Sequence, residues 1–141
     1  MHRPQHLLAV CFCAGVLGAL LSSALLMLAG RLDAFELLGV QMAAPLQAAW
    51  LYPRLIWGGL WGLVYFLAVG TTRGRGRWAR RGMWVSILPT AFELLIVFPY
   101  WREVGLLGRD LGALTLGVVL AANLIWGFFT GIACRLLWGR R

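Results

Sequence analysis

The chain has 141 residues, of which 61% are hydrophobic and only 13% are charged. Ordinary soluble domains are about 45–50% apolar and roughly 25% charged, so a water-soluble fold of this length would leave too much apolar surface uncovered. The formal net charge of +8 comes from arginines that flank apolar runs, which is typical of membrane orientation and lipid contact rather than of nucleic-acid binding.

Four long apolar runs predict four transmembrane helices. The runs cover about residues 7–30, 51–70, 83–101 and 111–134. Each has close to the ~20 residues that a helix needs to cross the hydrocarbon core, and none alternates as a spanning strand does. The first run is too long for the apolar part of a signal peptide, so we expect it to be retained. The predicted fold class is an all-α integral membrane protein with a single transmembrane domain over residues 1–141.

The distribution of arginine predicts the orientation. The connection 71–82 and both chain ends are basic, whereas the connections 31–50 and 102–110 are nearly balanced in charge. The positive-inside rule then places both termini and the connection 71–82 on the cytoplasmic side of the cell inner membrane. We expect anionic lipids to contact the five arginines of that connection, which are Arg73, Arg75, Arg77, Arg80 and Arg81. The connection 31–50 is too apolar for a free loop, which favours an interfacial or shallow re-entrant segment.

Parts of the sequence recur after 69 residues. The clearest matches are Leu37–Gly39 with Leu106–Gly108 and Leu55–Gly58 with Leu124–Gly127. The comparison extends over residues 14–72 and 83–141, and each half would hold two helices. This predicts two tandem helix hairpins related by a pseudo-twofold axis along the membrane normal. The alternative is that tryptophan–glycine pairs recur through composition alone.

Glycines spaced by four residues lie at equivalent places in the two halves. They are Gly58 and Gly62 in the second helix and Gly127 and Gly131 in the fourth, with Trp57 and Trp126 beside them. Such spacing puts both glycines on one helix face, where a neighbouring backbone can approach closely. We expect the second and fourth helices to pack through these faces. The competing interpretation is that one face binds a partner protein.

Three polar residues within the apolar runs are candidates for a site: Glu93, Arg54 and Asn123. An ionisable group at membrane depth is costly, and such a residue is a functional candidate by default. Arg54 is expected to reach Glu93 and form an ion pair, while Asn123 is expected to form an interhelical hydrogen bond. A protonated Glu93 with a purely structural role is the other interpretation. Pro89, one turn before Glu93, is expected to interrupt the third helix.

Motifs for metal, cofactor or catalytic chemistry are missing from the sequence. His2 and His6 both precede the first helix, which excludes a haem held by two histidines within the membrane. The three cysteines lack zinc spacing and a disulfide framework. No nucleophile elbow, phosphate-binding loop or zinc-protease motif occurs. We therefore expect no metal, no cofactor and no enzymatic activity.

Two function classes fit these features. The first is a non-enzymatic accessory or structural subunit of a membrane complex, acting through its glycine-faced, tryptophan-rich helices. The second is a small dimeric transporter or channel that uses the intramembrane Glu93. Both classes imply a homo-oligomer or a larger membrane complex, and neither involves nucleic acid.

Overall fold

The computed structural model describes residues 4–41, 47–69 and 77–138. Within these ranges 87% of the residues are helical and no strand is present, which confirms the all-α prediction. In chain order the elements are α1 (Pro4–Arg31), α2 (Ala34–Leu37), α3 (Ala48–Val69), α4 (Trp78–Val85), α5 (Ile87–Phe92), the π-helix η1 (Glu93–Trp101), the 3-10 helix η2 (Leu106–Leu111) and α6 (Thr115–Trp138).

Three helical stretches of the described chain are long and apolar enough to cross a membrane. They are Gln5–Arg31, Trp78–Trp101 and Thr115–Trp138, with 27, 24 and 24 residues. The predicted second span is also a helix, α3, and it is 22 residues long, but it is not one of the three. The polar start of α3, with Tyr52, Pro53 and Arg54, lowers its mean hydropathy. Three spans are thus supported by composition and length, and the fourth stays a prediction.

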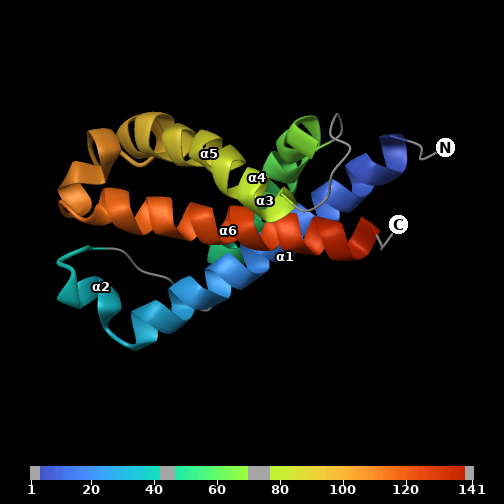
Figure 1. The fold of residues 1–141 in the computed structure, drawn as a ribbon. Helices are drawn as coiled ribbons and strands as arrows, with labels where there is room; N and C mark the ends of the chain where they lie inside the picture. Colours follow the sequence, from blue (N-terminus) through green and yellow to red (C-terminus); the bar gives the residue numbers. More distant parts are fainter. Residues whose placement is uncertain (1–3, 42–46, 70–76, 139–141) are drawn as a thin grey trace.

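The long helices form a bundle in which α1 and α6 cross (Figure 1). α3 packs mainly against α1, and α4 packs mainly against α6. The first turn of α1 and the last turn of α6 lie at one end of the bundle, which we call the terminal end. α2 and η2 lie at the opposite end, which we call the α2–η2 end.

Residues 31–41 close the α2–η2 end of the bundle. The backbone N–H of Gln41 donates to the carbonyl of Leu111 at 2.7 Å and joins this segment to η2. Phe35 and Val40 are buried, so the apolar character of the segment is partly explained by packing. Whether the segment is interfacial or re-entrant stays a prediction, and residues 42–46 of this connection lie outside the described residues.

The third helix begins at Trp78, earlier than the predicted Met83, and it is not regular. α4 ends at Val85, α5 follows, and η1 continues as a π-helix from Glu93. Pro89 has no N–H to donate to the carbonyl of Val85, four residues earlier, which accounts for the interruption there. π-helices are rare and are frequently found at functional sites. The π-helix begins at Glu93, which is one of the polar candidates identified in the sequence.

The last helix begins later than predicted. Leu111 belongs to η2, and α6 runs from Thr115 to Trp138. Gly108 and Gly112 adopt φ angles of 69° and 133° between these elements. Such angles favour glycine, so these two residues allow the chain to turn before α6 begins.

The glycines of α3 pack against α1. A methyl group built on Gly58 would lie 2.8 Å from the carbonyl oxygen of Gly15, and one on Gly62 would overlap the carbonyl of Cys11. Only glycine permits this approach between two backbones, which gains dispersion contacts in a lipid environment. The glycine face of the second predicted helix therefore contacts the first helix.

The glycines of α6 pack against α4. A methyl group on Gly127 would overlap the carbonyl of Gly82, and one on Gly131 would lie 2.5 Å from Ala79 Cα. The expectation that α3 and α6 pack on each other through their glycine faces is wrong, because each face is covered by a different helix. The sequence spacing identified the close-contact faces but carried no information about which helix covers them.

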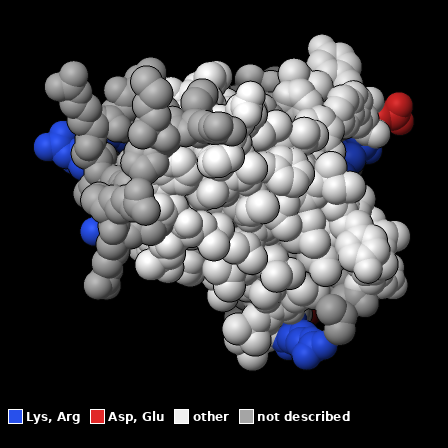
Figure 2. Space-filling view, turned by 90° about the vertical axis from the view of Figure 1, so that its right-hand side faces the viewer, with Lys and Arg blue, Asp and Glu red and all other residues white. Residues whose placement is uncertain are grey.

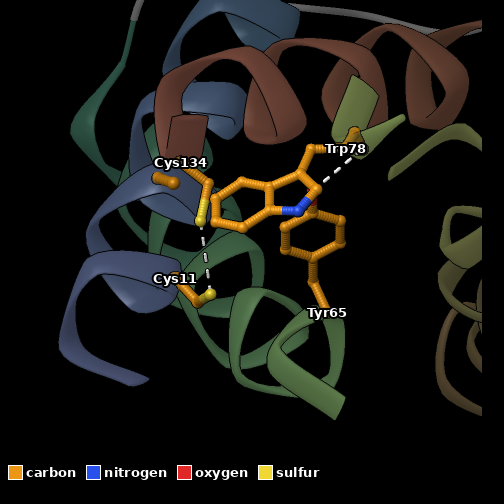
Figure 3. Packing of buried hydrophobic residues seen from close by; sticks show 5 residues of the cluster. Cys11, Tyr65, Trp78 and Cys134 are labelled. Atoms are coloured by element: carbon orange, nitrogen blue, oxygen red, sulfur yellow. Dashed lines mark hydrogen bonds between the residues drawn. The ribbon is translucent and has the colours of Figure 1, made fainter. Parts of the chain in front are cut away.

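The terminal end holds a core to which four helices contribute (Figure 3). Tyr65 donates its hydroxyl hydrogen to the carbonyl of Trp78 at 2.8 Å. The Sγ atoms of Cys11 and Cys134 lie 3.4 Å apart, so α1 and α6 are in direct contact there. All four side chains are buried. This part of the bundle is tightly packed.

The outer surface of the bundle is largely apolar. The face shown in Figure 2 is mostly uncharged, with arginine and acidic side chains at its edges. Large apolar side chains are exposed on the long helices, including Leu28 on α1, Leu67 on α3 and Leu136 on α6. Exposure on this scale is unfavourable in water but is expected where lipid surrounds the helices.

Candidate functional site

A cavity of about 370 Å³ lies between α1, α3, η1 and α6, in the half of the bundle nearer the α2–η2 end. Its wall contains the three polar residues predicted from the sequence, Arg54, Glu93 and Asn123. The remaining lining residues are Ala19, Ser22, Ala49, Trp50, Pro53, Trp57, Gly58, Trp61, Pro89, Phe92, Val97, Trp101, Arg102 and Trp126. The cavity thus combines charged groups with many aromatic side chains.

Arg54 is held in place by two neighbours. Its Nε donates to the hydroxyl of Ser23 on α1 at 3.0 Å. Its guanidinium carbon lies 4.9 Å from the ring centre of Trp50, one turn earlier on α3. A cation over an indole face is electrostatically stabilised, and more strongly so away from water. The side chain is therefore anchored by a neutral acceptor and a ring, neither of which cancels its charge.

Glu93 is the first residue of η1 and is half-buried in the cavity wall. Asn123 Nδ2, on α6, donates to Glu93 Oε2 at a long distance of 3.5 Å. The expected direct ion pair with Arg54 is not formed among the described residues. Arg54 acts on Glu93 through electrostatic attraction across the cavity instead, because Ser23 and Trp50 hold its guanidinium.

Aromatic side chains connect α3 to α5 and η1 along one wall. The ring of Phe92 lies 5.6 Å from Trp57, 5.7 Å from Trp61 and 5.6 Å from Trp101, measured between centroids. Trp57 and Trp101 lie 6.2 Å apart. The pairs are tilted or edge-on, and edge-on pairs at these distances are favourable. Trp57 therefore contributes to the cavity wall as well as to helix packing.

Trp126 forms part of the floor of the cavity. Its indole N–H donates to the carbonyl of Gly15 at 3.0 Å, and its side chain is buried. Trp126 thus joins α6 to α1, where Gly18 brings the two helices close. Trp57 and Trp126, at equivalent positions in the two predicted repeats, both line the cavity.

The burial of the lining residues defines a mouth and a floor. Ser22, Gly58 and Trp126 are buried, whereas Trp101 and Arg102 are exposed. These two lie at the end of η1, and Ala49, Pro53 and Trp57 on α3 are exposed as well, so the cavity is open between the first half of α3 and the end of η1, on the side of the α2–η2 end. The guanidinium of Arg102 lies 5.8 Å from the ring centre of Phe98 and lines this opening.

Several residues of the cavity were not singled out as site residues in the sequence analysis. Arg102 is the most important of them, since it adds a second positive charge to the lining, while Ser23, which is not part of the lining, anchors Arg54 from α1. The four-residue spacing of Trp50 and Arg54 on one helix face was a signal for their contact. No comparable signal marked Ser23 or Arg102, because their roles depend on contacts between distant segments.

The other predicted positions lie away from the cavity. Arg77 and Arg80 are exposed near the start of α4, while Arg81 donates to the carbonyl of Ala68 at 2.8 Å. Arg73 and Arg75 lie outside the described residues. Among the residues that the structure describes, no group of three or more His, Cys, Asp or Glu side chains is placed to hold a metal ion.

The fold and the cavity define a helical protein with three candidate membrane spans and a charged, aromatic-lined cavity within the bundle. Comparison with known protein families, with curated proteins and with solved structures gave no match.

Proposed function

We propose that this chain is a small multi-pass membrane transporter or channel, without catalytic activity, in which Glu93 is the proton- or cation-binding group. The observation that carries the proposal is the convergence of Glu93, Arg54 and Asn123 on one cavity inside an otherwise apolar bundle. Buried polar groups at membrane depth are costly and usually mark a pathway or a binding site. A π-helix that begins at Glu93 agrees with a functional position.

The proposal includes four membrane crossings. α1 runs from the terminal end to the α2–η2 end, and α4 begins again near the terminal end. The segment between them, α3, must therefore return along the bundle. Its 22 residues correspond to about 33 Å of helix, enough to cross a hydrocarbon core of about 30 Å. The aromatic and arginine side chains near its start can reach the polar interface.

The proposed orientation places both termini in the cytoplasm and the protein in the inner membrane. Exposed Arg77 and Arg80 near the terminal end support this, because cytoplasmic connections carry an excess of arginine. Anionic lipid headgroups are the proposed partners of this basic end, including Arg73, Arg75 and Arg81. The mouth of the cavity then faces the outer leaflet.

Two tandem hairpins are also part of the proposal. The glycine face of α3 covers α1 and that of α6 covers α4, so the second helix of each hairpin contacts the first helix of the same hairpin. Gly39 and Gly108, equivalent in the repeat, adopt nearly the same positive φ angles of 68° and 69°. Both features support a duplicated helix hairpin.

A flux measurement tests the transporter proposal. The purified protein is reconstituted into phosphatidylcholine–phosphatidylglycerol vesicles, and a trapped dye reports internal pH after an imposed pH gradient. We expect proton flux above protein-free vesicles, and we expect the Glu93→Gln variant to lose most of it, because the amide cannot take up a proton. Glu103→Gln is the matched control, since Glu103 is exposed and lies outside the cavity lining.

Equal flux through the wild type and Glu93→Gln would reject Glu93 as the transported-ion site. Absence of any flux would favour the second candidate, an accessory subunit. A specific observation supports that candidate, since Trp84 is 65% exposed on α4 beside other exposed apolar residues. Recovery of a stoichiometric larger complex in mild detergent would then be expected. The glycine faces offer a partner little room, because helices of this chain already cover them.

A further inference from the structure

The charges that face the cavity do not balance. Arg54 and Arg102 each contribute a positive charge, whereas Glu93 is the only acidic residue of the described lining. Arg54 is attracted by Glu93 and repelled by Arg102, so its charge is within electrostatic reach of both groups. One positive charge is therefore left without a counter-ion among the described lining residues, and Arg102 places it at the exposed mouth of the cavity.

Both arginines have donors that are free for a ligand. Arg54 uses its Nε for Ser23, and in the described part of the chain no hydrogen bond engages its two terminal nitrogens. The guanidinium of Arg102 is likewise without a hydrogen-bond partner among the described residues and contacts only the face of Phe98. Guanidinium groups bind phosphate and carboxylate oxygens through paired hydrogen bonds.

The rest of the wall is suited to an apolar group. Five tryptophans and Phe92 line the cavity, and the buried floor is formed by Gly58 and Trp126. Binding pockets for small molecules are usually apolar with a few polar groups that set orientation. A free inorganic anion would leave these aromatic surfaces without contact. A hydrocarbon chain attached to the anion would cover them.

We propose that this cavity binds an amphiphile with a single anionic headgroup, a phosphate or carboxylate on an apolar chain, which enters at the mouth beside Trp101. The headgroup lies between Arg102 and Arg54, and the chain lies along the tryptophan wall. This inference rests on the proposed function, because it assigns a ligand to the same cavity. Glu93 is more buried than Arg102, and its negative charge disfavours a ligand that carries more than one negative charge.

Three probes with the same ten-carbon chain test the headgroup. Decyl phosphate, decyltrimethylammonium and decyl maltoside are titrated against the purified protein in a non-ionic detergent, and binding is read from tryptophan fluorescence. We expect decyl phosphate to bind about tenfold more tightly than the other two, the factor that one charge-assisted hydrogen-bonded contact supplies. Inorganic phosphate alone should not compete, because it cannot contact the aromatic wall.

Variants separate the cavity from the rest of the surface. Arg102→Gln removes an exposed charge whose one side-chain contact among the described residues is the face of Phe98, and it should weaken decyl phosphate about tenfold. Glu93→Gln should strengthen decyl phosphate binding by removing the negative charge. Arg109→Gln is the control, since Arg109 is exposed outside the cavity lining and should change nothing.

Two outcomes would overturn the inference in different ways. Tighter binding of decyltrimethylammonium, weakened by Glu93→Gln, would show a cation site, and the proposed transport function would stand. Equal and weak binding of all three probes, unaffected by Arg102→Gln, would show that the cavity binds no amphiphile. In that case the flux measurement with Glu93→Gln still decides the proposed function, since it requires no amphiphile in solution.

Discussion

Arg54 keeps its charge directed into the cavity because its two anchors are neutral. Ser23 accepts a hydrogen bond from Nε, and Trp50 offers the face of its ring. An ion pair with Glu93 would have cancelled both charges, whereas both groups line the cavity here without pairing, and Glu93 accepts only a long hydrogen bond from Asn123. A buried charge without full compensation is costly, so this arrangement is more readily explained by a ligand than by stability.

The cysteines provide a residue-scale prediction. Because the Sγ atoms of Cys11 and Cys134 lie 3.4 Å apart, a mild azo oxidant should take one hydrogen from each thiol and leave a disulfide that links α1 to α6. Mass spectrometry of the denatured protein should then show the loss of two hydrogens per chain. Cys13, which is exposed, serves as the internal control and should remain free.

Substitution of Cys134 by serine should abolish this cross-link and leave Cys11 as a thiol. A disulfide between Cys13 and another residue, or between two chains, in place of the Cys11–Cys134 link would contradict the placement of α1 against α6. Formation of the Cys11–Cys134 disulfide would show that α1 and α6 lie close together at the terminal end. This test does not depend on the proposed function.

At the scale of helices, close backbone contact holds the bundle together. Glycine faces bring α3 onto α1 and α6 onto α4, while Trp126 and Gly18 join α1 to α6. Lipid tails are as apolar as the helix surfaces, so helix association depends on such close contacts more than on hydrophobic burial. The loosely filled region between α3 and η1 remains as the cavity.

Glycines of α6 give a prediction at this scale. Gly127→Leu should destabilise the protein by about 1–3 kcal/mol or more, because the added side chain forces α4 away at Gly82. The midpoint of unfolding in a detergent titration, followed by circular dichroism, measures the change. Gly117→Leu is the matched control on the same helix, where an added Cβ meets nothing within 4 Å. Equal midpoints for the two variants would show that α4 and α6 do not meet at Gly127.

For the whole molecule, the number of crossings decides where the ends lie. Four crossings return the chain to the side on which it started, and three would leave its two ends on opposite sides. α1 begins and α6 ends at the same end of the bundle, together with the start of α4. Under the proposed topology, a reporter attached after Glu103 and one attached after Arg141 should therefore lie on opposite sides of the membrane.

Reporter fusions test this topology. Alkaline phosphatase, which is active only outside the cytoplasm, should be active when fused after Glu103 and inactive when fused after Arg141. A fluorescent protein that folds only in the cytoplasm should show the opposite pattern. Activity of the phosphatase at Arg141 would indicate that α3 does not cross, since removing one crossing moves the end of the chain to the other side.

The sequence by itself determined the helical class and the membrane-compatible segments. Apolar runs long enough for a bilayer predicted helices, and three of them meet the length and composition that a span requires. The polar candidates could also be recognised in the sequence, because Glu93, Arg54 and Asn123 stand out in apolar surroundings. These features are local, so no knowledge of the tertiary structure was needed to find them.

Only the tertiary structure decided which elements meet. It paired the glycine faces with α1 and α4, directed Arg54 to Ser23 rather than to Glu93, and brought Arg102 to the mouth of the cavity. Residue spacing specifies which side chains share a helix face, but it does not specify the neighbour that covers this face. The cavity exists only where four separate segments are brought together, so its charge balance could not be read from any one of them.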